Sequence, residues 1–201
     1  MEPRAYALTT VDRVRNVRLR IENDGFDVLF ANLINAASDY IEGECNRRFM
    51  QTDYEELHTV HTYGQQVLVL RQAPVSEVTA FEYRSGTKTT PTWNDYDPDS
   101  WELDEDAGII EVNTMLEKFL RVSYTAGYLI DWENEDDITK HTLPFDLTDL
   151  AERIVVKWYK RKEAEGKLSE GFDGAQIAWR EGLTKEDEAT IARYRRLPVL
   201  S

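Results

Sequence analysis

The feature that most constrains this chain is a double change in its hydrophobic periodicity. From residue 27 to residue 48, apolar side chains recur every three or four positions, as on the buried side of an amphipathic helix. From residue 57 the pattern alternates, as in a half-buried strand, and after Pro144 it becomes helical again. A chain with this pattern holds helices and strands in separate segments, which predicts an α+β protein. The residues of the first helical stripe are Phe30, Leu33, Ile34, Ala37, Ile41 and Cys45.

The alternating part contains several short strands separated by close turns. Glycine or proline lies between most of the runs, at Gly64, Pro74, Gly86 and Gly108. Short strands joined by such turns predict an antiparallel sheet or a small barrel. The expected strands are residues 57–63, 67–70, 75–83, 101–103, 109–112 and 120–124.

Three further helices are expected outside this region. Thr9 and Thr10 can cap the first, which carries Val14, Val17 and Ile21 on one side. Another begins at Pro144, because proline suits a first helical turn. The last begins after Thr184 and ends before Pro198. The helix stripes predict mutual burial of Ile34, Ile41, Ile154 and Trp158.

The charge of the chain is strongly negative and unevenly distributed. It has 24 basic and 38 acidic residues, a net charge of −14, and residues 94–137 hold 14 acids against two bases, a net charge of −12. This balance argues against wrapping of nucleic acid by a basic surface. The single cysteine, Cys45, excludes an internal disulfide and favours a reducing compartment. No run of residues has the apolar character of a membrane span or a signal peptide, so an intracellular product is expected.

No group of residues has the spacing of a catalytic or metal site. His58 and His61 are three positions apart on an expected strand, so they point to opposite faces. The acidic run from Asp95 lacks the glycine that a calcium loop needs, and no phosphate-binding loop or nucleophile elbow is present. We therefore expect no catalytic residue, no metal and no cofactor, which favours a structural or binding role. Three aromatics in the acidic stretch are either interface anchors or parts of a loop that covers the sheet, namely Trp93, Tyr96 and Trp101.

Four segments resemble, in the same order, segments of the tailed-phage head–tail connector family, also called adaptor or head-completion proteins. Residues 29–49 are similar to its helix with Ala-Ala-Ser and Ile-Glu, followed by arginine and phenylalanine. Residues 70–78 are similar to its strand, Pro-Val and strand. Residues 122–128 closely match its Tyr-Thr-Ala-Gly-Tyr, and residues 143–147 carry a proline like the one that opens its next helix.

The resemblance, which covers about residues 26–160, implies a fold. In that family a small bundle of about four helices carries an antiparallel β-rich insertion between the second and third main helices. For this chain it implies one connector domain over residues 1–201, with helices in 10–48 and 144–196 and the insertion at 53–128. A flexible tail is expected at residues 197–201.

The resemblance also implies a mechanical role without catalysis. Subunits of the family form a ring of about twelve copies beneath the portal of the filled head. The implied partners are the portal protein, neighbouring copies, and the next neck or tail protein. DNA passes through the ring without sequence-specific binding, and no membrane is involved. The implied location is the neck of the virion, which is assembled in the host cytoplasm.

A ring needs two different faces of one subunit to meet. The acid-free arginine side of the first helix, together with Lys157–Lys162, is one candidate face, and the acidic stretch is the other. Complementary charge would set the register of such a contact. The expected interface residues are Arg13, Arg15, Arg18 and Arg20 on the basic side, and Asp104, Glu105, Asp106, Asp136 and Asp137 on the acidic side.

The end of the chain is expected to bind the portal. Its basic residues precede an apolar tail that can add to an exposed sheet edge. The residues are Arg193, Tyr194, Arg195, Arg196, Leu197, Pro198, Val199 and Leu200. Two other functions stay open at this point: a small acidic soluble module that sequesters a basic partner, and a hydrolytic enzyme with an unrecognised site.

Overall fold

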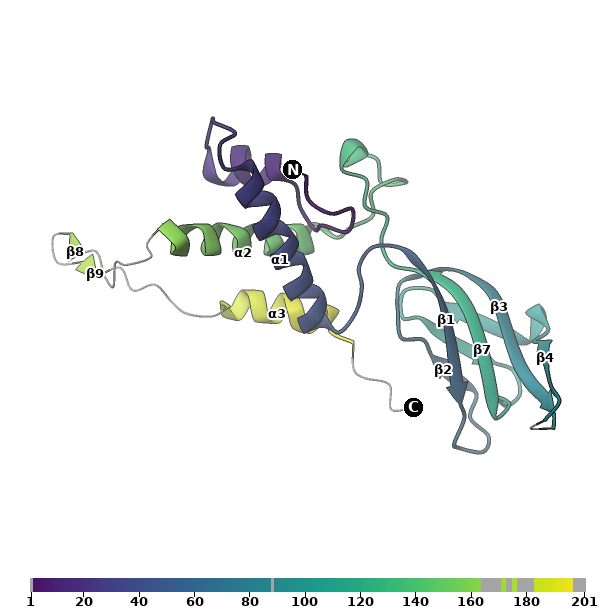
Figure 1. The fold of residues 1–201 in the computed structure, drawn as a ribbon. Coiled ribbons are helices and arrows are strands. Elements are labelled where there is room, and N and C mark those ends of the chain that lie inside the picture. The colour runs from purple at the N-terminus through teal and green to yellow at the C-terminus, as the bar shows by residue number, and fades with distance from the viewer. Residues whose placement is uncertain (1, 88, 164–170, 173–174, 177–182, 197–201) are drawn as a thin grey trace. The chain divides into compact units, whose positions relative to one another are not determined.

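The computed structural model describes residues 2–87, 89–163, 171–172, 175–176 and 183–196 (Figure 1). The chain forms two compact units. The helical unit comprises residues 1–46 and 130–195, and the sheet unit comprises residues 47–129 and 196–201. Helices and antiparallel sheets are both present, so the predicted α+β class is confirmed.

The helical unit is built on α1 (Asp27–Cys45), α2 (Phe145–Glu163) and α3 (Lys185–Tyr194). Helix α1 packs against both others (Figure 1). The predicted stripe of α1 is buried, except that Leu33 is only half-buried. Phe30 contacts Tyr159 of α2 with ring centroids 5.2 Å apart, and the Cys45 thiol donates to the Ile191 carbonyl of α3 at 3.7 Å. Two short strands, β8 (Gly171–Phe172) and β9 (Ala175–Gln176), pair antiparallel and also belong to this unit.

The first helix differs from its prediction. Residues Arg13–Leu19 form a π-helix, η1, whose hydrogen bonds run from residue i to residue i+5 rather than i+4. The wider turn changes which side chains share a face. Val14 is fully buried, but Val17, expected beside it, is 63% exposed.

Of the four residues on α1 and α2 that were predicted to be buried together, three are buried. Ile34, Ile41 and Ile154 are buried, whereas Trp158 is only half-buried. Its ring packs edge-on against Tyr40 with centroids 6.1 Å apart. The neighbouring Tyr159 takes the interior place, between Phe26 and Phe30. The prediction that Trp158 is buried was therefore wrong, because the adjacent Tyr159 is the buried residue.

Helix α3 begins where the sequence predicts. The Thr184 hydroxyl accepts from the Asp187 backbone N–H at 3.2 Å, and the Asp187 carboxylate accepts from the Thr184 N–H at 3.0 Å. This reciprocal capping satisfies two backbone donors that the first helical turn leaves without partners. The helix ends at Tyr194, and residues 197–201 of the expected tail lie outside the described residues.

The sheet unit contains two antiparallel sheets that enclose one core. The four-stranded sheet has the order β1-β7-β3-β4, and the three-stranded sheet has the order β2-β6-β5. Side chains from both sheets meet in the core, including Leu68, Phe81, Ile110 and Tyr124. The strands are β1 (Thr52–Thr59), β2 (Val67–Val69), β3 (Val75–Gly86), β4 (Pro91–Asp95), β5 (Trp101–Asp104), β6 (Ile109–Val112) and β7 (Phe119–Ala126).

Two strand predictions differ from the structure. Strand β1 begins at Thr52 rather than at Leu57, and β4 was not predicted at all.

The backbone geometry of Gly127 explains why the Tyr-Thr-Ala-Gly-Tyr segment contains a glycine. Its φ is +112°, and a Cβ atom there would lie 2.8 Å from the Met50 backbone, so only glycine fits.

Candidate functional site

The described residues offer neither a metal cluster nor a membrane helix. No group of three His, Cys, Asp or Glu side chains in this part of the chain could hold a metal ion. No helix among the described residues is long and apolar enough to cross a bilayer.

The sheet unit buries one carboxylate, that of Glu56 on β1, which is 7% exposed. The Tyr124 hydroxyl donates to it, the Arg71 backbone N–H donates at 3.1 Å, and His58 Nε2 lies 2.8 Å away. Burial by itself raises the pKa of Glu56, but the neighbouring His58, Tyr124 and Arg71 groups together lower it below its ordinary value. The Tyr124 hydroxyl, buried beside this carboxylate, has a raised pKa. The arrangement holds a charged carboxylate inside the sheet unit.

The lowered pKa of Glu56 predicts a loss of stability in acid. A group whose folded-state pKa lies below its unfolded value stabilises the fold fully above the unfolded value, here about 4.5. That stability is lost as the pH falls through the lower folded-state pKa. We expect the urea midpoint of the wild type to fall more steeply than that of Glu56→Gln between about pH 6 and pH 3. Parallel curves for the two proteins would show that Glu56 does not carry this effect.

Among the described residues of the helical unit, the carboxylates of Glu42, Glu152 and Asp187 are buried, and that of Glu152 on α2 is the most deeply buried of the three, at 1% exposed. Arg13 Nε lies 2.7 Å from Glu152 Oε1, and Arg18 Nε lies 2.6 Å from Oε2. The Thr9 hydroxyl also donates to Oε1, at 3.2 Å. Arg18 contacts Asp149 one turn away as well. These bonds fix η1 against α2.

The other predicted interface arginines have different surroundings. Arg15 forms two hydrogen bonds to the Asp27 carboxylate, at 2.9 and 2.8 Å. Arg13 makes a second ion pair with Glu135 at 3.0 Å. Arg20 is exposed and has left-handed backbone geometry, with φ 54°. Three of the four arginines thus contribute to the fold of their own subunit, and their role between subunits stays a prediction.

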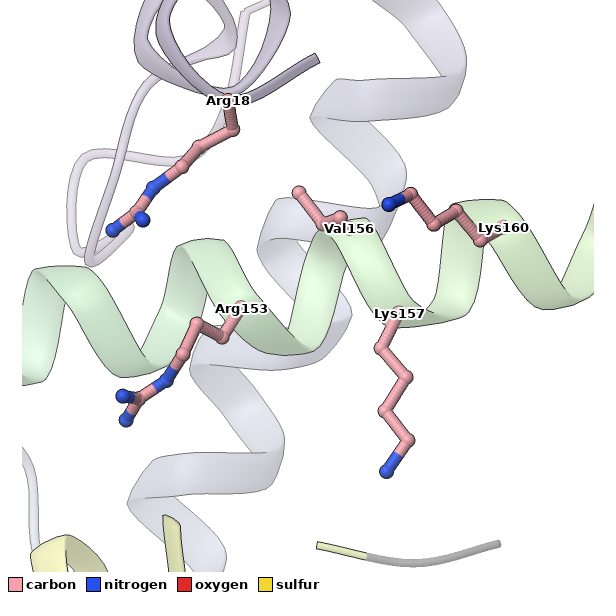
Figure 2. Close-up of a pocket in the computed structure, with 5 residues that line it drawn as sticks. All are labelled: Arg18, Arg153, Val156, Lys157 and Lys160. Atoms are coloured by element: carbon pink, nitrogen blue, oxygen red, sulfur yellow. The ribbon is translucent and has the colours of Figure 1, made fainter. Parts of the chain in front are cut away.

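An open basic pocket of about 430 Å³ lies beside this network (Figure 2). Arg18 of η1 forms one side. The other lining residues lie three or four positions apart along α2 and therefore share one helix face. Lys160 is exposed, and no ion pair among the described residues involves it. The basic pocket consists of Arg18, Arg153, Val156, Lys157 and Lys160.

Arg153 links this pocket to the rest of the helical unit. It forms ion pairs with Asp149 and with the buried Asp187 of α3, both at 3.0 Å. Its Nε atom is buried and has no hydrogen-bond partner within the part of the chain that the structure describes. Lys157–Lys162 were predicted from the sequence as part of a basic face, whereas Arg153 and Val156 were not. The i, i+3, i+4, i+7 spacing of residues 153, 156, 157 and 160 was the signal available for finding them.

The predicted acidic interface residues fall in two different settings. Asp104, Glu105 and Asp106 are exposed at the turn between β5 and β6. Asp137 accepts from the Thr139 N–H and hydroxyl at 3.0 and 2.6 Å, and Lys140 lies 3.9 Å from it. Asp136 is exposed. Acidic side chains of the loop at residues 131–141 thus already contact groups of the same loop. The three acidic side chains of the turn at 104–106 form no ion pair among the described residues.

The three predicted interface aromatics have different neighbours. Tyr96 stacks on Phe81 with centroids 4.2 Å apart, and Trp101 packs edge-on against the same ring. Both belong to the periphery of the sheet core. Trp93 lies under the Arg121 guanidinium, 4.7 Å from its ring centre. The sheet-covering alternative describes Tyr96 and Trp101, and an interface role for the three stays untested.

The described residues among those predicted to bind the portal are engaged within the chain. Arg193 and Tyr194 both bond to the Asp146 carboxylate at 2.6 Å. Arg195 bonds to the Glu44 carbonyl and carboxylate, at 2.8 and 3.0 Å. Within the sheet unit, Arg196 donates to the Ala107 carbonyl at 2.9 Å. Leu197, Pro198, Val199 and Leu200 lie outside the described residues.

Comparison with solved structures gives the fold. A chain in the neck of an empty GTA particle computed with C6 symmetry is 22% identical, with a TM-score of 0.57 over 94% of this chain and 90% of that chain. A chain of the virion of a native gene transfer agent (GTA) particle is 21% identical, with a TM-score of 0.57 over 94% and 88%. A chain in the neck of a native GTA particle computed with C12 symmetry is 22% identical, with a TM-score of 0.52 over 100% and 97%.

Comparison with families of sequences gives a further match. A family model described as head completion protein matches residues 7–197. No curated protein matches the chain.

Proposed function

Because this chain belongs to the head completion protein family, we propose that it is a structural protein that joins the head of a phage-like particle to its neck and tail. The family match over residues 7–197 carries the proposal, and it confirms the resemblance found in the sequence. The fold supports it, since structures of GTA particle necks contain chains of the same fold over nearly the whole length. Its place would be the neck of the particle.

The proposed form of action is a ring beneath the portal. About twelve copies would fit the C12 and C6 symmetries with which the two GTA necks were computed, because a twelvefold ring also contains sixfold symmetry. The ring would continue the DNA channel, and a net charge of −14 would keep the channel wall from holding phosphate groups. The next neck or tail protein would bind the free side of the ring.

The contact with the portal is proposed to lie at the C-terminal end. Because Arg193, Tyr194 and Arg195 are bonded to Asp146 and Glu44 of their own subunit, they anchor the start of this segment. The portal contact itself would then be made by residues 197–200, outside the described part.

Mixing the full chain with the portal of its own particle tests the proposed function. We expect size-exclusion chromatography with light scattering to give one complex with about one copy bound per portal subunit. The chain without the portal is the control, and it is free to remain a monomer. If the two proteins elute separately at low salt, even when the chain is in excess over the portal, the proposal is contradicted. Capture of a basic protein in place of the portal would favour the acidic binding module instead.

A further inference from the structure

The outer side of the three-stranded sheet combines valines with carboxylates. Leu68 and Ile110 point into the core of the sheet unit, so the positions next to them point outward. Val67 and Val69 are accordingly 38% and 39% exposed. The outward set, called here the acid–valine face, comprises Val67, Val69, Glu102, Asp104, Ile109 and Glu111.

Two glutamates of this face lie directly opposite each other. Glu102 on β5 is the register partner of Glu111 on β6, and both are exposed. Like charges in directly opposite positions destabilise a sheet. No ion pair in the described part of the chain involves either of them, and the adjoining turn adds Glu105 and Asp106. A cation supplied from outside the subunit would relieve this repulsion.

The basic pocket has the opposite chemistry. Val156 is a half-buried apolar centre among two arginines and two lysines (Figure 2). The arginines are held in place by Asp149, Glu152 and Asp187. Lys160 is exposed on the same face. A partner with carboxylates around a small apolar patch would match this surface in both charge and polarity.

We propose that the acid–valine face of one copy docks on the basic pocket of the next copy. The two surfaces are different parts of the same chain, so the contact is heterologous and repeats from subunit to subunit into a ring. Glu102 and Glu111 approach the ammonium groups of Lys157 and Lys160, while Val67 and Val69 cover Val156. This inference rests on the proposed function, and it names the partner of the pocket.

The other acidic loop and DNA fit the pocket less well. In the loop at residues 131–141, Glu135 and Asp137 already contact Arg13, Thr139 and Lys140 of the same subunit. DNA requires an extended basic surface, but Asp149 and Glu152 stand beside the pocket arginines and would repel phosphate groups. A protein surface that brings both carboxylates and valines satisfies the pocket better.

Two charge-reversed variants test the contact in the assembly with the portal. Lys160→Glu and Glu111→Lys are each expected to reduce ring formation at least about tenfold, because each brings like charges together. An equimolar mixture of the two is expected to restore it. In a ring where the two variants alternate, the acidic pocket of Lys160→Glu meets the basic face of Glu111→Lys. At the next contact the unchanged pocket of Glu111→Lys meets the unchanged face of Lys160→Glu. Lys185→Glu and Glu77→Lys, at exposed positions outside both surfaces, are the matched controls and are expected to assemble normally.

Further readouts separate this contact from a folding effect. Glu111→Lys removes the repulsion with Glu102, so its isolated subunit is expected to melt above the wild type while assembling worse. A chain that carries both Lys160→Cys and Glu111→Cys is expected to form disulfides between neighbouring copies, which give a ladder of linked subunits. The native Cys45 is buried and is not expected to take part. If the wild type forms no rings, the proposed function itself is wrong. The inference alone is wrong if the wild type forms rings and any one of four results is found. These are normal assembly of both variants, no restored assembly in the mixture, disulfides formed only within single subunits, or loss of DNA binding while rings still form.

Discussion

Replacing Glu152 with alanine is expected to lower the free energy of unfolding by about 3–5 kcal/mol. The carboxylate is 1% exposed and is shared by Arg13, Arg18 and Thr9. Its removal leaves two guanidinium groups partly buried without their main acceptor, and removal of one partner of such a group is costly. The link between η1 and α2 would be lost as well. Urea denaturation followed by circular dichroism measures the change.

The matched control is Glu186→Ala on α3. Glu186 is exposed in the first turn of its helix, so its replacement is expected to change the free energy of unfolding by no more than about 0.5 kcal/mol. A Glu152→Ala protein as stable as this control would show that the network does not fix η1 in place.

Reversing Arg18 to glutamate is expected to destabilise the subunit by a similar amount, about 3–5 kcal/mol or more. Arg18 contacts both Asp149 and Glu152, and a third carboxylate there would face two others. The sequence alone indicated an exposed, acid-free helix face, on which this reversal would leave the subunit folded. The structure predicts a thermal melt far below that of the wild type.

Arg20→Glu provides the comparison for this variant. Arg20 is exposed, and no ion pair among the described residues involves it. Its reversal is expected to leave the melt nearly unchanged, so any effect on ring assembly can be assigned to the surface. Equal melting temperatures for Arg18→Glu and Arg20→Glu would contradict the structural role of Arg18.

Local patterns predicted the elements that local interactions control. The buried stripe of α1 and the capping of α3 by Thr184 follow from neighbours three or four positions away, and both are present in the structure. The π-helix η1 does not follow from such a pattern, because its wider turn moves Val17 to the surface. Trp158 and Tyr159 are adjacent, and only the packing of Phe26 and Phe30 decides which of them is buried.

The site depends on contacts between distant parts of the chain, which a sequence pattern does not contain. Arg13 and Glu152 are 139 positions apart, and Arg18 and Glu152 are 134 apart. The arginines were recognised as a group, but the acids that hold them were not. The acid–valine face was hidden for a related reason: the alternation of β5 and β6 was visible, whereas their register, which places Glu102 opposite Glu111, was not.

The family could be identified from the sequence because several residues of its signature have a definite role in the fold. Gly127 in the Tyr-Thr-Ala-Gly-Tyr segment occupies a backbone position that only glycine tolerates. Pro144 precedes α2, whose buried residues pack against α1. The match of the head completion family over residues 7–197 extends this resemblance beyond the four segments to almost the whole chain.

An electron cryo-microscopy reconstruction of the full chain bound to the portal of its own particle tests the central claim most directly. The account predicts a closed ring of copies coaxial with the portal, with the DNA channel continuing through its centre. Neighbouring copies in this ring should touch through the basic pocket of one and the acid–valine face of the next. Copies bound singly around the portal without contacting one another, or no bound copies at all, would contradict it.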